Sequence, residues 1–221
     1  MIVPPILFPR KVFTMNNVIH LSDHNRITDL ATLGCCGSTW YTNAIAEVDT
    51  LCRLEDWSVE RFVSILSLTS PRVSVRRNVR IALQYTDNNT FLENVVGNIR
   101  QSVGRYEKSG TIGGQKVRAF RSAILGNQFA LVLDVHMSRA FNVDQKHWDK
   151  THVRNRAYRI VESVANRLGE SIRDTQAMTW CGVFKRAGKI APSFSILHEY
   201  RNWLAYDRNY PQTGTIATLV S

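Results

Sequence analysis

The sequence has few cysteines and few prolines, and it lacks a long apolar run. Four cysteines occur among 221 residues, and no pair has the C-x-x-C spacing of a zinc or iron–sulfur site. The six histidines are scattered, so we expect no metal centre and no cofactor. No apolar stretch is long enough to span a membrane, and the apolar first residues precede Arg10, which is the reverse of a secretory signal. We therefore expect an intracellular protein without a membrane partner.

Acidic residues are scarce in the C-terminal two thirds of the chain. Residues 1–71 carry a net charge of −2, whereas residues 72–221 carry +12, which accounts for the total of +10. A basic surface of this kind predicts a polyanionic partner, first of all nucleic acid. The alternative is a soluble basic protein with no such partner.

Helical periodicity dominates the chain, and the one apolar run that could form a strand, 129–133, is short. We predict an all-α fold in which residues 1–38 form an irregular arm, 39–204 a helical domain and 205–221 a loose tail. Helices are expected over 40–51, 61–68, 91–106, 156–168, 171–186 and 194–204. Two further helices are expected, one after Pro71 and a short one that carries Lys116 and ends at Gly126.

Three arginines follow Pro71 at a helical spacing. Arg72, Arg76 and Arg80 occupy positions i, i+4 and i+8, and no acidic residue lies between Arg72 and Tyr85. Three arginines along one helical face can follow a phosphate backbone. A solvated charged face is the alternative interpretation.

Lys116 and Asp134 lie eighteen positions apart and have complementary chemistry. The pair Gly113-Gly114 precedes the helix of Lys116, and a glycine turn before a helix exposes backbone N–H groups that suit a phosphate. An amine and a carboxylate in one cleft suit displacement at a glycosidic carbon. Because the helix between them is roughly 20 Å long, a reversing connection is needed to bring the two side chains together.

Two motifs resemble those of the helix–hairpin–helix DNA glycosylase superfamily, in particular its endonuclease III-like members. The segment L-D-V-H-M-S-R at 133–139 resembles the family pattern V-D-T-H-V-x-R, which follows a G-x-K lysine at the same distance as Asp134 follows Lys116. The segment L-S-L-T-S-P-R-V-S-V at 66–75 is similar to L-S-x-Q-x-x-D-V-S-V. The resemblance implies two helical lobes with a cleft between them.

The resemblance also implies individual roles. Asp134 would be the essential carboxylate, and Lys116 the amine that attacks the sugar in members that also cleave the strand. Thr69 stands where the family places a residue that wedges into DNA, and His136 and Arg139 would support the site structurally. The residues that we expect to bind DNA are Thr69, Arg72, Arg76, Arg80, Gly113, Gly114, Gln115 and Arg118. Candidates for stacking on a base are Trp40, Tyr41, Tyr106, Phe141 and Trp148.

These observations predict a monomeric DNA glycosylase that acts on a flipped base of double-stranded DNA, in the cytoplasm, the nucleoid or a phage-infected cell. Cleavage of the N-glycosidic bond would be its reaction, with Lys116-dependent AP lyase activity as an extension. Phage enzymes that install hypermodified thymines share this scaffold, and their S-P-R and D-V-H segments are similar to 70–72 and 134–136. Base modification is therefore one alternative, and non-catalytic DNA binding through the hairpin is another.

Overall fold

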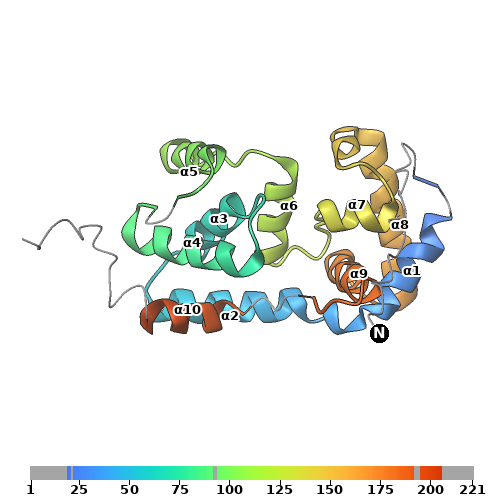
Figure 1. Ribbon diagram of the computed structural model, residues 1–221, viewed down its shortest axis with the longest axis horizontal. Coiled ribbons are helices and arrows are strands. Elements are labelled where there is room, and N and C mark those ends of the chain that lie inside the picture. The colour runs from blue at the N-terminus through green and yellow to red at the C-terminus, as the bar shows by residue number, and fades with distance from the viewer. Residues whose placement is uncertain (1–18, 21, 92–93, 192–194, 206–221) are drawn as a thin grey trace, which may run out of the picture.

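The computed structural model describes residues 19–20, 22–91, 94–191 and 195–205, and within them the regular structure is helical without any strand. The all-α prediction is confirmed. The elements are α1 Asp23–Leu33, η1 Cys35–Gly37, α2 Trp40–Leu54, α3 Val59–Thr69, α4 Val75–Asn88, α5 Gly97–Ser109, α6 Gln115–Ile124, α7 Val135–Phe141, η2 Gln145–Asp149, α8 Thr151–Leu168, α9 Ile172–Arg186 and α10 Ile196–Trp203 (Figure 1).

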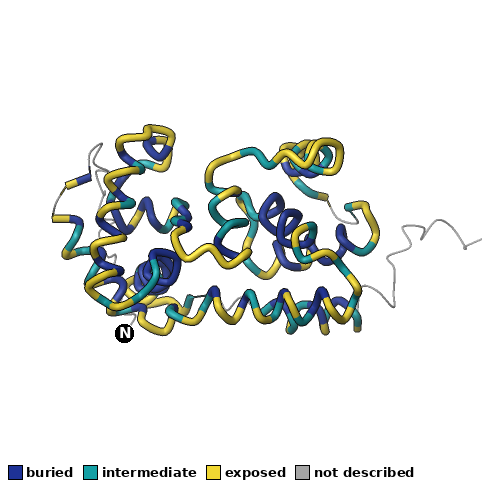
Figure 2. The backbone as a smooth tube through the Cα atoms, turned by 180° about the vertical axis from the view of Figure 1, so that it is seen from behind, coloured by how far each residue is buried: buried dark blue, intermediate teal, exposed yellow. Residues whose placement is uncertain are grey.

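The buried apolar residues form two clusters. The first lies among α2–α6 and α10, and the second among α1, α7, η2, α8 and α9. Figure 1 shows the two groups of helices side by side, with α2 and α10 running beneath the first group. Helix α9 belongs to both clusters, because Ala177 packs in the first and Met178 in the second. It is also the most enclosed helix, since every residue from Ile172 to Gly182 is buried (Figure 2).

Short polar residues set the starts of several helices. The Ser58, Ser74, Ser171 and Ser195 hydroxyls accept hydrogen bonds from backbone N–H groups three residues further on. The cap at Ser74 starts α4 at Val75, so the prediction that Arg72 belongs to this helix is wrong. Arg72 instead has a left-handed backbone with φ 61°.

The prediction of an irregular arm over residues 1–38 is wrong for its second half. Residues Asp23–Leu33 form α1, whose Ile27, Leu30 and Ala31 are buried in the second cluster. The apolar residues of this segment have helical spacing. The segment is only eleven residues long and ends before Gly34, so its periodicity is a weak signal. Residues 1–18 of the predicted arm and 206–221 of the predicted tail lie outside the described residues.

Two helix starts and the conformation of residues 129–133 also differ from expectation. Helix α5 begins at Gly97 and not at Phe91, whose ring packs 4.5 Å from that of Tyr85. Helix α8 begins at Thr151, five residues early, because buried Val153 extends its apolar face into a polar segment. The apolar run 129–133 forms no strand; it connects α6 to α7 and places Ala130 and Val132 in the first cluster.

Helices α1 and α9 approach each other closely at glycines. A Cβ on Gly182 of α9 would lie 1.9 Å from the Leu30 carbonyl oxygen of α1, and one on Gly34 would lie 2.1 Å from the Met178 carbonyl oxygen. Neither position can hold a larger side chain without backbone movement. Two glycines thus allow α1 to lie directly on α9.

Candidate functional site

A cavity of about 220 Å³ is lined by helices of both groups. Its walls are mainly apolar and aromatic, and it also contains one carboxylate, one amine, one guanidinium and one imidazole. The lining residues are Trp40, Tyr41, Ser70, Arg72, Val73, Val75, Asn78, Lys116, Phe120, Val132, Asp134, Val135, His136, Gln176, Ala177 and Trp180. The volume lies below the roughly 300–1,000 Å³ of drug-sized ligand sites, so the cavity suits a single small aromatic group.

Asp134 is held by the start of α7. It is the N-cap of that helix, and its Oδ1 accepts hydrogen bonds from the backbone N–H groups of His136 and Met137, both at 2.9 Å. Its Oδ2 forms no hydrogen bond or ion pair with any residue that the structure describes. One carboxylate oxygen therefore fixes the side chain while the other is left for a ligand.

Lys116 reaches the same cavity from the first turn of α6. The connection 125–134 reverses the chain, as the sequence required, and brings the amine and the carboxylate to one site. Within the described residues no ion pair joins Lys116 to Asp134, so the two groups line the cavity separately. Such an arrangement leaves room for a reacting centre between them.

The helix α6 also begins with free donors. Its N-cap is Gly114, with φ 77° and no side-chain cap, so the first amides of the helix are not satisfied by a side chain. The left-handed φ explains the glycine at this position. The predicted turn at Gly113 and Gly114 therefore precedes α6 directly, beside Lys116, and its role in anion binding stays a prediction.

His136 is enclosed by aromatic rings at the edge of the site. Its imidazole lies 4.6 Å from the Phe184 ring and 5.6 Å from the Trp180 ring. Burial lowers the pKa of His136 below its ordinary value, the charge of Asp134 opposes this shift, and Arg139 and Lys116 add to it. These effects favour the neutral imidazole.

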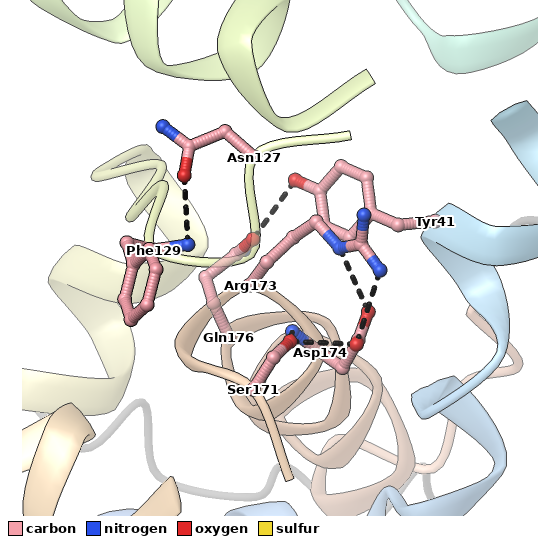
Figure 3. Close-up of polar contacts among 7 residues, drawn as sticks. All are labelled: Tyr41, Asn127, Phe129, Ser171, Arg173, Asp174 and Gln176. Carbon is pink, nitrogen blue, oxygen red and sulfur yellow. Dashed lines mark hydrogen bonds and ion pairs between the residues drawn. The ribbon is translucent and has the colours of Figure 1, made fainter. Parts of the chain in front are cut away.

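A buried polar network lies behind the cavity (Figure 3). The Tyr41 hydroxyl donates to Gln176 Oε1 at 2.9 Å, and the Arg173 guanidinium lies 5.6 Å over the Tyr41 ring. Arg173 forms two hydrogen bonds with Asp174, at 3.0 and 3.2 Å, and Asp174 also accepts one from Ser171. The Arg173–Asp174 pair lies within α9, and the contacts of Tyr41 with Gln176 and Arg173 join α2 to α9.

Arg72 stands at the cavity in a strained conformation. A non-glycine residue with φ 61° costs roughly 1–2 kcal/mol, and such strain often lies at functional sites. The side chain is exposed, and it has no ion-pair partner among the described residues. The loop between α3 and α4 therefore holds a free guanidinium against the cavity.

We predict that Arg72→Gly separates the backbone strain from the charge. The glycine relieves the left-handed strain, so the free energy of unfolding is expected to rise by about 1 kcal/mol. If Arg72 binds DNA, as the sequence predicts, loss of the guanidinium also lowers the affinity for duplex DNA. Arg72→Ala is the matched variant, because it removes the same charge and keeps the strain. Chemical unfolding and salt-dependent DNA titration would measure both effects, and equal stabilities of the two variants would contradict the strain.

Several predicted DNA-binding residues lie elsewhere. Thr69, which was expected to bind DNA, is fully buried, and its hydroxyl donates to Asn78 Oδ1 at 2.7 Å, so it has no exposed surface for such a contact. Arg76 forms an ion pair with Glu199 of α10 at 2.8 Å. The expected face of three arginines is therefore wrong as well, because Arg72 is outside the helix and Arg76 is neutralised. Arg80 is exposed on α4.

The remaining predicted residues occupy surface or core positions. Arg118 is exposed on α6, and Arg139 is exposed with its carbonyl oxygen accepting from Arg26 at 3.1 Å. Among the stacking candidates, Trp40 and Tyr41 line the cavity, whereas Phe141 and Trp148 are buried in the second cluster. Tyr106 packs against the first cluster.

Sequence reasoning missed the contribution of α9. Gln176, Ala177 and Trp180 line the cavity from a helix distant in sequence from both motifs. The spacing of Gln176 and Trp180 at i and i+4 places them on one helical face, but many helices carry such pairs. Of the residues described, no group of three His, Cys, Asp or Glu is placed to hold a metal ion.

These features define an all-α protein whose two groups of helices enclose a small aromatic cavity with one carboxylate and one amine. Residues 30–187 match a family of unknown function, DUF7178, and the chain belongs to that family. The matched range contains every residue that lines the cavity. No curated protein and no solved structure matches the chain. In the described part of the chain, no helix is long and apolar enough to cross a membrane.

Proposed function

We propose that this protein is a DNA glycosylase that draws one base of a DNA duplex into the cavity and cleaves its N-glycosidic bond. The observation that carries the proposal is the convergence of Lys116 and Asp134 on one cavity with aromatic walls. The resemblance implies two lobes with a cleft between them, and the proposal is supported by a cavity that helices of both groups line. Base flipping costs a few kcal/mol, and stacking on aromatic side chains helps to offset it.

The proposed reaction uses Asp134 at the sugar. As the bond between C1′ and the base breaks, its electron pair leaves with the base and positive charge develops on the sugar, which the free Oδ2 of Asp134 stabilises. Water then attacks C1′ and loses a proton to the carboxylate. In the lyase extension the Lys116 amine attacks C1′ in place of water and forms a Schiff base with the opened sugar.

The proposed DNA contacts surround the cavity. The amides at the start of α6, from Gly114 to Lys116, would bind a phosphate, supported by the helix dipole. Arg72 and the exposed Arg118 would add charge contacts to the backbone, and the net charge of +10 supports a polyanionic partner. The partner that we propose is double-stranded DNA.

The test is a panel of duplex oligonucleotides, each with one damaged, modified or mismatched base, incubated with and without borohydride. Base release that leaves an abasic site is the expected result. If Lys116 is the nucleophile, a protein–DNA adduct is trapped by borohydride in the wild type but not in Lys116→Ala. Lys185→Ala, which changes an exposed lysine in the last turn of α9, is the matched control and keeps the adduct.

The same panel distinguishes the alternatives by their products. Base release without an adduct supports a glycosylase that uses water alone. A base of altered mass that is still attached to its sugar, found by mass spectrometry, would overturn base release in favour of base modification. Tight, salt-dependent binding with no product across the panel would replace the enzyme with a non-catalytic DNA-binding protein.

A further inference from the structure

Two side-chain amides line the cavity, those of Asn78 and Gln176, and among the described residues only the NH₂ group of Gln176 has no hydrogen-bond partner. Asn78 Nδ2 donates to the Leu66 carbonyl oxygen at 3.1 Å, and its Oδ1 accepts from Thr69 at 2.7 Å. Asn78 therefore joins α3 to α4, and both its oxygen and its NH₂ group take part in that link. Gln176 is 4% exposed, and its Nε2 forms no hydrogen bond within the described part of the chain. The NH₂ group of Gln176 is therefore the amide group of this cavity wall that a ligand can bind.

The orientation of the Gln176 amide is determined by Tyr41. Burial, together with the charge of Asp134, raises the pKa of Tyr41, so the side chain stays a neutral hydroxyl. A buried hydroxyl proton needs an acceptor, and Gln176 Oε1 at 2.9 Å supplies it (Figure 3). This bond uses one lone pair of the amide oxygen and fixes the direction of the amide, and the NH₂ group is the part of Gln176 that has no partner among the described residues.

The Tyr41 ring is itself fixed. Arg173 lies over its face, and Arg173 is held by Asp174, which also bonds to Ser171. Rotation of the Gln176 amide would turn its NH₂ group toward the Tyr41 hydroxyl and leave the hydroxyl proton without its acceptor. The polarity of the cavity wall is therefore built into the fold as a hydrogen-bond donor.

We infer that Gln176 selects the base, and that it selects one that presents a carbonyl oxygen at this wall. The inference rests on the proposed function. A donor pairs with the keto oxygen of thymine, uracil, guanine or hypoxanthine, whereas the amino groups of cytosine and adenine are themselves donors and leave both groups unpaired. The flanking rings of Trp40 and Trp180 stack on any base, so they supply affinity without this discrimination.

The test uses pairs of duplexes that differ only in a keto or an amino group. Uracil is compared with cytosine opposite the same thymine, and hypoxanthine with adenine opposite the same guanine. Affinity is measured by fluorescence anisotropy in the Asp134→Asn background, so that binding is measured without base loss. The expected result is keto preference of roughly 10- to 100-fold in at least one pair, because a mismatched donor leaves buried polar groups unpaired.

Two variants assign the preference to this wall. Gln176→Leu is expected to abolish the preference, so that the keto and amino duplexes of each pair bind with equal affinity. Tyr41→Phe is expected to weaken the preference, because the amide can then rotate; this marks Tyr41 as a positioning residue. Circular dichroism melting checks that both variants fold. Mismatch stability contributes equally with and without the substitution, so it cancels when the two keto preferences are compared.

Each other outcome counts against the inference in a distinguishable way. The inference is overturned if the keto preference survives in folded Gln176→Leu. It is also overturned if the protein with Gln176 intact binds duplexes tightly but shows no preference. Both results leave the proposed function standing. Failure to bind any duplex, matched or mismatched, overturns the proposed function and the inference with it.

Discussion

Asp134→Asn is expected to reduce the rate of base release by roughly 10²- to 10⁴-fold while duplex affinity stays near that of the wild type. The carboxylate is proposed to stabilise charge that exists only in the transition state, so its loss affects the chemical step and not binding. The asparagine oxygen can still accept from the His136 and Met137 amides, because Asn is as good an N-cap as Asp. Single-turnover rates on the best substrate of the oligonucleotide panel measure the effect.

The chain contains a matched control for this substitution. Asp144 caps η2 in the same way, accepting from the Lys146 amide at 3.1 Å, and it does not line the cavity. Asp144→Asn should therefore keep the wild-type rate. If Asp134→Asn retains a rate within a few-fold of the wild type, Asp134 is a helix cap and no more, and the proposed chemistry fails.

Gly182→Ala is expected to lower the free energy of unfolding by about 2–3 kcal/mol. The added Cβ would stand 1.9 Å from the Leu30 carbonyl oxygen, which is backbone of α1 and cannot rotate away. Overpacking of this kind typically costs about 1–3 kcal/mol or more, and the clash outweighs the roughly 1 kcal/mol by which alanine favours a helix. The melting temperature should fall by about 5–10 °C for a protein of this size.

Gly104→Ala is the matched control for the helix-propensity effect. Gly104 lies within α5, and a Cβ there would meet nothing within 4 Å. Alanine at this position is expected to stabilise the protein by roughly 0.5–1 kcal/mol. If Gly182→Ala is stabilising as well, α1 does not lie directly on α9 in solution, and the packing that positions Gln176 and Trp180 would need revision.

The sequence could predict the part of the site that one continuous segment supplies, from Lys116 to Asp134. Lys116 and Asp134 are separated by one helix and one reversing connection, so their spacing carries the information that brings them together. The sequence identifies Trp40 as an aromatic candidate, but nothing in the sequence places it in the same cavity as Lys116. Arg72 was misplaced because Pro71 and Ser74 both favour a helix start, and the cap at Ser74 determines the boundary.

Helix α9 shows why the remainder could not be predicted. Its buried residues include Arg173, Asp174 and Gln176, which a periodic pattern would assign to a solvated face. They are buried because they satisfy one another and Tyr41, and such pairing depends on contacts between α2 and α9 that local sequence does not encode. The short helix α1 was missed for a related reason, since its stability comes from α9 and not from its own pattern.

The order in which the chain contributes to the two hydrophobic clusters has a consequence for how this protein can be divided. The chain enters the second cluster with α1, passes to the first with α2–α6, returns with α7–α9 and ends in the first with α10. Among the described residues neither half is a continuous segment, so no single cut there yields two pieces that each hold a complete core. Within the described residues, one recombination event therefore cannot exchange either half as a module, and the cavity between the two groups is inherited only as a whole.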